Sequence, residues 1–298
     1  MRLVALRVGI GVPTRAFTAV VRSVFVNAAI LTVADRLVTL VPAAAGGLPA
    51  AITVAVPPGF NFANFLGIGA EAVSRAGILR FAGCIASVDL RLALDWRSGL
   101  RDMSLDLSSP VTERAWHSAV TTLRADGRST AIARLAPEAI LTLGHATRDF
   151  SLAFAERAAA RLVGLGAGGT PAGDDLLVGY LAGLWSSIQG IRPRIDFAAG
   201  LGGAVRGLAK RTNDVSRAYL EAASHGEVSE RLTALTTCII AGATPTAVAE
   251  AAAAAIAVGH SSGADGVLGL LLGLAVWGPE PIFTESRCLI YDIPAPGI

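Results

Sequence analysis

The chain contains two copies of one motif, a polar glycine-rich loop followed by an apolar segment of helical length. The first copy spans residues 173–185 and the second spans residues 263–274. The copies share a leading glycine, an aspartate two residues later, two glycines four residues apart and two leucines. Glycine permits backbone turns that other residues disfavour, and the first turn of a helix leaves N–H groups unpaired. The motif therefore predicts two loop-to-helix units whose polar N-terminal ends meet at one site.

Glycines within the apolar segments predict how the two helices pack. They are Gly179 and Gly183 in the first copy and Gly269 and Gly273 in the second. Residues four apart share a helix face, and a glycine inside a helix costs about 1 kcal/mol relative to alanine. Close contact between the two backbones would offset that cost. We therefore expect the two helices to pack against each other in the core, with Asp175 and His260 at the same pocket.

Composition excludes several classes of function. The chain has 298 residues, of which 53% are hydrophobic and 16% charged, so it can bury a large core. A net charge of +2, with no basic run, argues against a nucleic-acid partner. The mean hydropathy of +0.57 is high, but the uncharged runs are short or broken by proline and glycine, so no membrane span is predicted. No signal-peptide pattern is recognised, and we expect a cytoplasmic protein.

Residues 1–100 have the pattern of a small β-rich domain. Short strands separated by turn signals are predicted over residues 20–33, 37–41, 51–56 and 87–96. In the last of these segments apolar and polar residues alternate, which is the period of a half-buried strand. We therefore predict an N-terminal barrel or sandwich.

The pattern changes to a helical one after residue 108. Ser109 and Pro110 form a helix-start signal, with serine as a candidate cap and proline at the first helical position. Further helices are predicted over residues 150–163, 175–189, 197–223, 227–241, 245–258 and 264–277, and residues 281–292 are expected to form a closing strand. The sequence thus predicts an α+β protein whose helical domain, residues 101–298, carries the paired loops.

Polar residues gather in three segments of this helical part. Two are the loops before the repeated helices, residues 164–175 and 259–265, and the third is a cluster at residues 211–216 that interrupts a predicted helix. The candidate catalytic residues are His260, Asp174, Asp175 and Asp265. The candidate substrate-binding residues are Gly168, Gly169, Thr170, Gly173, Thr212, Asn213, Asp214, Ser261, Ser262 and Gly263.

Each of these groups also has a structural explanation. Carboxylates in a first helical turn cap N–H groups and offset the helix dipole, and a histidine in a loop can simply bond to its own backbone. Imidazole can also transfer a proton near neutral pH, which makes His260 a candidate acid or base. Asp174 and Asp175 are candidates to bind a divalent cation. Adjacent residues point about 100° apart on a helix, so the two would need help from the loop.

Two common phosphate-binding motifs do not fit. The glycines of residues 164–169 lack the GxGxxG spacing and follow a predicted helix instead of a strand. A Walker loop ends in Gly-Lys-Ser/Thr, whereas this loop ends in Gly173-Asp174-Asp175.

Together, the loop from Gly164 through Thr170-Pro171-Ala172-Gly173-Asp174-Asp175, residues 212–216 and residues 259–265 resemble the AllH-like subunit family of oxamate carbamoyltransferase. The resemblance covers most of the chain. It implies a role in anaerobic allantoin breakdown, a branch of purine catabolism, where oxamate and carbamoyl phosphate interconvert with oxalurate and phosphate. It also implies a hetero-oligomer with other transferase subunits.

The leading hypothesis is an enzyme, or enzyme subunit, that acts on a small carboxylate or carbamoyl substrate. The anion would bind at the helix N-termini, hydroxyls of Thr170, Ser261 and Ser262 would orient it, and His260 would move a proton. The aspartates would position His260 or a cation. The alternative is a non-catalytic ligand-binding or scaffold subunit whose chemistry lies elsewhere in a complex.

Overall fold

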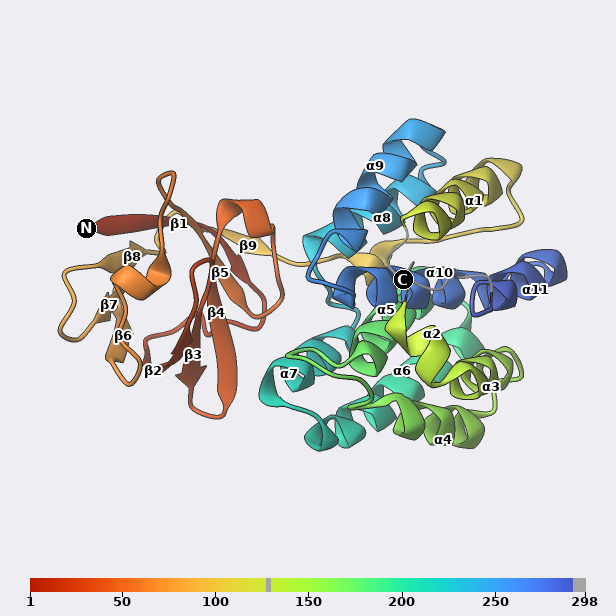
Figure 1. Ribbon diagram of the computed structural model, residues 1–298, viewed down its shortest axis with the longest axis horizontal. Helices are drawn as coiled ribbons and strands as arrows, with labels where there is room; N and C mark the ends of the chain where they lie inside the picture. Colours follow the sequence, from red (N-terminus) through yellow and green to blue (C-terminus); the bar gives the residue numbers. More distant parts are fainter. Residues whose placement is uncertain (127–129, 292–298) are drawn as a thin grey trace, which may run out of the picture. The chain divides into compact units, whose positions relative to one another are not determined.

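The computed structural model describes residues 1–126 and 130–291, and it contains two compact units that divide between Ser98 and Gly99 (Figure 1). The first unit is built from strands and the second from helices, which confirms the predicted α+β class. Within the described residues, no helix has the length and apolar character needed to cross a membrane.

The first unit is a closed barrel of eight strands with one additional strand. The strands are β1 (Arg2–Gly9), β2 (Phe17–Val24), β3 (Ala29–Val33), β4 (Arg36–Pro42), β5 (Ala51–Ala55), β6 (Glu71–Arg75), β7 (Ile78–Phe81), β8 (Ser87–Asp89) and β9 (Leu94–Trp96). Their order is β5-β4-β3-β2-β6-β7-β8-β1-β9, and β5 also pairs with β1, which closes the barrel. Alternate residues of the strands point inward and form an apolar core.

The single strand expected over residues 87–96 is two strands separated by a turn. Both β8 and β9 pair parallel with β1. Asp89 pairs with Val4 and Leu94 pairs with Arg7, so the segment from Asp89 to Leu94 is longer than the part of β1 that it faces. Asp89 stabilises the turn by accepting a hydrogen bond from the backbone N–H of Arg91, at 3.2 Å. The alternation across the turn is therefore lost, and Leu92 is 86% exposed. Likewise, residues 20–33 form parts of two strands, β2 and β3.

The second unit contains eleven helices among its described residues. They are α1 (Pro110–Ala125), α2 (Ala131–Leu135), α3 (Pro137–Arg148), α4 (Leu152–Leu162), α5 (Ala172–Ser186), α6 (Arg192–Leu208), α7 (Asp214–Ala223), α8 (Glu230–Ile240), α9 (Pro245–Ile256), α10 (Ser262–Ala275) and α11 (Glu280–Cys288). Figure 1 shows α5 and α10 in the middle of this unit, surrounded by the other helices. Nearly every residue of both central helices is buried, which explains why the two segments are apolar on all sides.

Helices α5 and α10 run parallel with their backbones in contact. A methyl group on Gly179 would overlap the carbonyl oxygen of Gly266, and one on Gly183 would lie 2.6 Å from the carbonyl oxygen of Leu270. Gly269 faces the carbonyl of Leu176 in the same way. The predicted close packing of the two repeated helices is confirmed, and it brings their N-terminal ends together.

Two other expectations about the helical part are wrong. Residues 281–291 do not form a strand, because residues up to Cys288 belong to α11, which has proline in its first turn and buries Ile282, Phe283 and Ser286 at helical spacing. Asp292 lies outside the described residues. The helix expected over residues 197–223 is divided into α6 and α7, with a break at Thr212.

Candidate functional site

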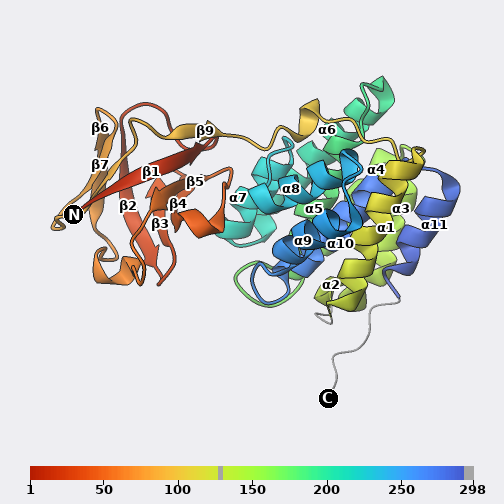
Figure 2. The ribbon, with the colours of Figure 1, turned by 90° about the horizontal axis from the view of Figure 1, so that it is seen from above.

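The two loops of the repeated motif meet at the N-terminal ends of α5 and α10. The hydroxyl of Thr170, from the first loop, lies 2.7 Å from the hydroxyl of Ser262, at the start of α10. Figure 2 shows the loop before α5, in green, beside the loop before α10, in blue. Both hydroxyls also act on the carboxylate of Asp175, in the first turn of α5, and lower its pKa. Side chains almost a hundred residues apart are thus joined in one polar cluster.

Asp175 is a carboxylate in an environment that disfavours its charge. Burial, with a smaller contribution from the nearby charges of Asp265 and Asp174, raises the pKa of Asp175 to about 7, although the hydroxyls of Ser262 and Thr170 act in the opposite direction. Its Oδ2 atom is buried and has no hydrogen-bond partner among the described residues. Such a carboxylate can accept or release a proton near neutral pH.

Asp265 occupies the equivalent position in α10. It is fully buried, and its Oδ1 atom accepts a hydrogen bond from the backbone N–H of Ile132, at 3.2 Å, in the first turn of α2. Burial raises the pKa of Asp265 to about 7, against the opposing hydrogen bonds from the backbone of Ile132 and the side chain of Ser261. Its Oδ2 atom, like that of Asp175, is buried without a described partner.

Helix α7 packs against α5, and two of its residues, Ser216 and Tyr219, are not among the candidate site residues. Ser216 is buried, and its hydroxyl has no partner among the described residues. Tyr219, one turn further along α7, has a pKa raised by burial and by the negative charge of Asp175. Ser216 lies within the polar cluster noted in the sequence, but the position of Tyr219 carries no signal, because only the packing of α7 on α5 places it near Asp175.

Asp174 anchors the first loop. It is 1% exposed, and its two carboxylate oxygens accept hydrogen bonds from the backbone N–H of Gly164, at 2.8 Å, and from the hydroxyl of Thr212. These contacts tie the end of α4 and the start of α7 to the first turn of α5. Both oxygens of Asp174 are therefore engaged by the protein itself, in contrast to those of Asp175.

The other members of the third polar cluster make local contacts. Asn213 caps α7 by accepting hydrogen bonds from the backbone N–H groups of Val215 and Ser216, both at 3.0 Å. Asp214 forms an ion pair with Arg217 at 2.7 Å. Their contacts stabilise the start of α7.

The glycines of the loops fall into two groups. A methyl group on Gly173 would overlap the carbonyl oxygen of Leu162, and one on Gly263 would overlap that of Ile256, so both glycines permit a close approach to the preceding helix. Gly168 and Gly169 have open space around them, and Gly168 has a φ of 101° that other residues rarely adopt. Open backbone of this kind leaves N–H groups available to a ligand.

His260 is exposed and precedes α10 by two residues. Within the described parts of the chain, no hydrogen bond or ion pair joins His260 to Asp175 or Asp265. The shared pocket expected for Asp175 and His260 thus remains a prediction. His117 and His225 pair with Glu285 and Arg206 respectively.

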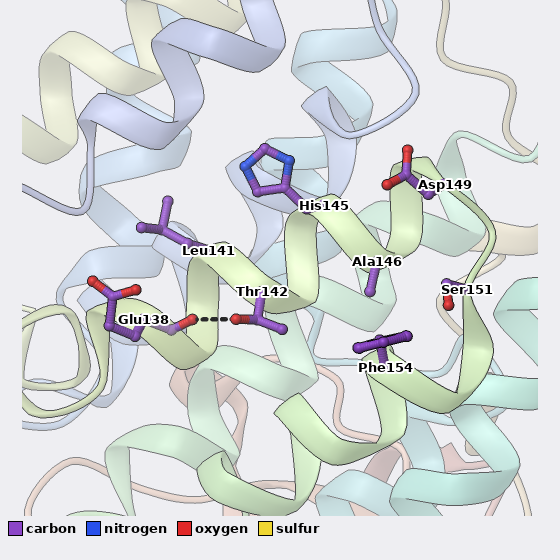
Figure 3. A pocket seen from close by; sticks show the side chains of 8 residues that line it. All are labelled: Glu138, Leu141, Thr142, His145, Ala146, Asp149, Ser151 and Phe154. Carbon is purple, nitrogen blue, oxygen red and sulfur yellow. Dashed lines mark hydrogen bonds between the residues drawn. The ribbon is translucent and has the colours of Figure 1, made fainter.

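A separate hollow of about 630 Å³ lies on the helical unit between α3 and α4 (Figure 3). Glu138, His145 and Asp149 line it from α3 and its C-terminal end, and Phe154 lines it from α4. None of the candidate site residues borders it. Its carboxylates and imidazole are exposed to solvent, so they lack the burial that alters the chemistry of Asp175 and Asp265.

Comparison with known proteins places the similarity on the helical unit. No curated protein and no solved structure matches the chain. One family does match, over residues 162–274, and it is described as oxamate carbamoyltransferase subunit AllH. This span begins at the last residue of α4 and ends within the last turn of α10, so it includes both loops, both central helices and α7. From α5 to α10, this chain is similar to subunit AllH of oxamate carbamoyltransferase.

Proposed function

We propose that this chain is a subunit of a carbamoyltransferase complex and that its paired loops bind a small anionic carboxylate or carbamoyl substrate. The observation that carries the proposal is the hydrogen bond between Thr170 and Ser262, which joins the two loops beside Asp175. The family match covers the whole of this arrangement. The cytoplasmic location and the role in allantoin breakdown belong to the same proposal.

Different polar groups would bind different parts of the substrate. Backbone N–H groups near Gly168 and Gly169, at the positive end of the α5 dipole, would bind the anionic group of the substrate. The hydroxyls of Thr170, Ser261 and Ser262 would orient it. His260, which is exposed just before α10, would contact the part of the substrate nearest to solvent.

Asp175 would act as the proton acceptor. In carbamoyl transfer to oxamate, a bond forms between the amide nitrogen of oxamate and the carbonyl carbon of carbamoyl phosphate, the bond from that carbon to the phosphate oxygen breaks, and the nitrogen loses a proton. A base works best when its pKa lies near the working pH. The pKa of about 7 for Asp175 meets that condition.

The test is phosphate release from carbamoyl phosphate and oxamate by the reconstituted complex. We expect Asp175→Asn to lower kcat about 100-fold or more, because general acid–base catalysis contributes factors of about 10² to 10⁴. Asp196→Asn is the matched control, since Asp196 is exposed on α6 and pairs only with Arg192. It should leave kcat unchanged.

The second candidate function is a non-catalytic subunit whose loops bind a ligand or hold a partner. It is favoured by the word "subunit" in the description of the matched family. Full activity of both Asp175→Asn and His260→Ala in the reconstituted complex would establish this second function and reject the first.

A further inference from the structure

Several buried polar atoms without a partner lie at or just before the N-terminal ends of helices. Among the described residues they include Oδ2 of Asp175, Oδ2 of Asp265, the hydroxyl of Ser216 and the hydroxyl of Thr130, the residue that precedes α2. A buried polar atom without a hydrogen bond costs free energy, and a buried carboxylate costs more than a hydroxyl. Atoms of this kind take a partner from outside the chain, either water or a bound ion.

Asp175 and Asp265 present their free oxygens from rigid supports. The two residues are equivalent in the repeat, each in the first turn of one of two parallel helices whose backbones touch. The hydroxyls of Thr170 and Ser262 act on Asp175 from nearby, and Asp265 accepts a hydrogen bond from the backbone N–H of Ile132. Each carboxylate has one buried oxygen, Oδ2, without a partner among the described residues.

The charge around these oxygens is negative. The carboxylate of Asp174 lies next to Asp175, and the charges of Asp174 and Asp265 both act on Asp175. Arg134 is the cation that acts on Asp265, and it is exposed at the end of α2. A bound water could donate hydrogen bonds to the free oxygens, but it would leave the charge of the ionised pair uncompensated.

We propose that Asp175 and Asp265 together bind one divalent cation of the magnesium type, with one free carboxylate oxygen from each. A divalent charge balances two carboxylates. This proposal concerns binding by the chain alone and does not depend on the proposed transferase function. It is an alternative to the role of proton acceptor for Asp175, because a carboxylate that binds a divalent cation holds no proton near neutral pH.

The available ligand atoms, two carboxylate oxygens, favour magnesium over zinc. Among the described residues, no three side chains of His, Cys, Asp or Glu converge, as a protein-bound zinc ion would require. Mg²⁺ is commonly held by one or two carboxylates and completes its six oxygen ligands with water and with substrate oxygens.

The experiment is binding of Mn²⁺, the paramagnetic substitute for Mg²⁺, to the purified full chain after treatment with EDTA. Electron paramagnetic resonance of free Mn²⁺ should show one saturable site per chain, and excess Mg²⁺ should displace the Mn²⁺. Asp175→Asn and Asp265→Asn should each weaken Mn²⁺ binding at least about tenfold. A loss of about tenfold is the lower limit even when the replaced residue only supports a metal ligand. Asp196→Asn should bind as the natural chain does.

Absence of saturable Mn²⁺ binding by the natural chain would overturn the proposal, as would unchanged binding by both folded asparagine variants. A second measurement needs no variant and so does not depend on how well one folds. Fe²⁺ with ascorbate cleaves a backbone near a bound metal, and we expect Mg²⁺-protected cleavage near residues 170–175 and 261–265. Cleavage elsewhere, or at those positions without protection by Mg²⁺, would reject the site.

Discussion

The two copies of the loop-to-helix motif share their packing positions but differ in how their polar residues are held. In both copies the leading glycine lies against the end of the preceding helix, and two further glycines face the partner helix. The first copy then has Asp174, which bonds to Gly164 and Thr212, where the second has the buried Ala264. The second aspartate of each motif bonds to different neighbours.

This difference separates two kinds of constraint. The glycines occupy equivalent positions in the two copies because the backbones of α5 and α10 contact each other there. The polar residues differ because the hydroxyl of Thr212 bonds to the first copy, whereas the backbone N–H of Ile132, in α2, bonds to the second. Backbone contact thus dictates what is repeated, and the surrounding helices dictate what varies.

The largest expected effect comes from breaking the shared packing. Gly179→Leu and Gly269→Leu should each lower the free energy of unfolding by about 3 kcal/mol or more, at the upper end of overpacking, because each side chain would meet a backbone carbonyl. Chemical denaturation followed by circular dichroism measures this. Gly207→Leu on α6 is the matched control, since nothing lies within 4 Å of a methyl group there. A loss in only one of the two copies would contradict the equivalence of the two helices.

A smaller effect on stability is expected from the raised pKa that Asp175 and Asp265 share. The pKa of Asp175 and that of Asp265 are raised by burial from 3.8 to about 7. Between pH 4 and pH 7 the unfolded chain releases these protons while the folded chain retains them, so the stability contributed by the protonated carboxyls is complete below pH 4 and is lost as pH rises to 7. We expect the free energy of unfolding in EDTA to fall over this interval by no more than about 4 kcal/mol for each carboxyl.

Thermal unfolding at a series of pH values measures this fall. Asp175→Asn and Asp265→Asn should each flatten the curve, whereas Asp196→Asn should not. The groups that face the pair, namely Asp174, Tyr219 and Arg134, are unchanged in these variants. Equal curves for the natural chain and both asparagine variants would show that burial does not shift these two carboxyls.

The smallest effect tests the contact between the copies. Thr170→Val and Ser262→Ala each remove one side of the 2.7 Å hydrogen bond, and their double-mutant cycle should give a coupling energy of about 1 kcal/mol. The cycle of Thr170→Val with Thr121→Val on α1, whose hydroxyl bonds only to its own helix, is the control and should show no coupling. Zero coupling for the first cycle would mean that the two loops are held together by the helices alone.

Much of the helical unit could be predicted from the sequence because its signals are local. Proline at the start of α1 and the glycine spacing in α5 and α10 act within a few residues, and the structure has these features where they were expected. The alternation in residues 87–96 was misleading. The turn after Asp89 arises from pairing with β1, which lies at the other end of this unit's sequence, so no local pattern predicts it.

The repeat alone determined that two parallel helices with touching backbones would bring their polar ends together, since only glycine allows such an approach. Tertiary structure decided which polar atoms are satisfied there. Asp174 and Asp175 are neighbours in the chain, yet Asp174 bonds to the protein through both oxygens and Asp175 keeps one oxygen free. The physical reason is that hydrogen bonding and desolvation depend on elements from elsewhere in the chain, here α7 and α2, and no local pattern records where those elements pack.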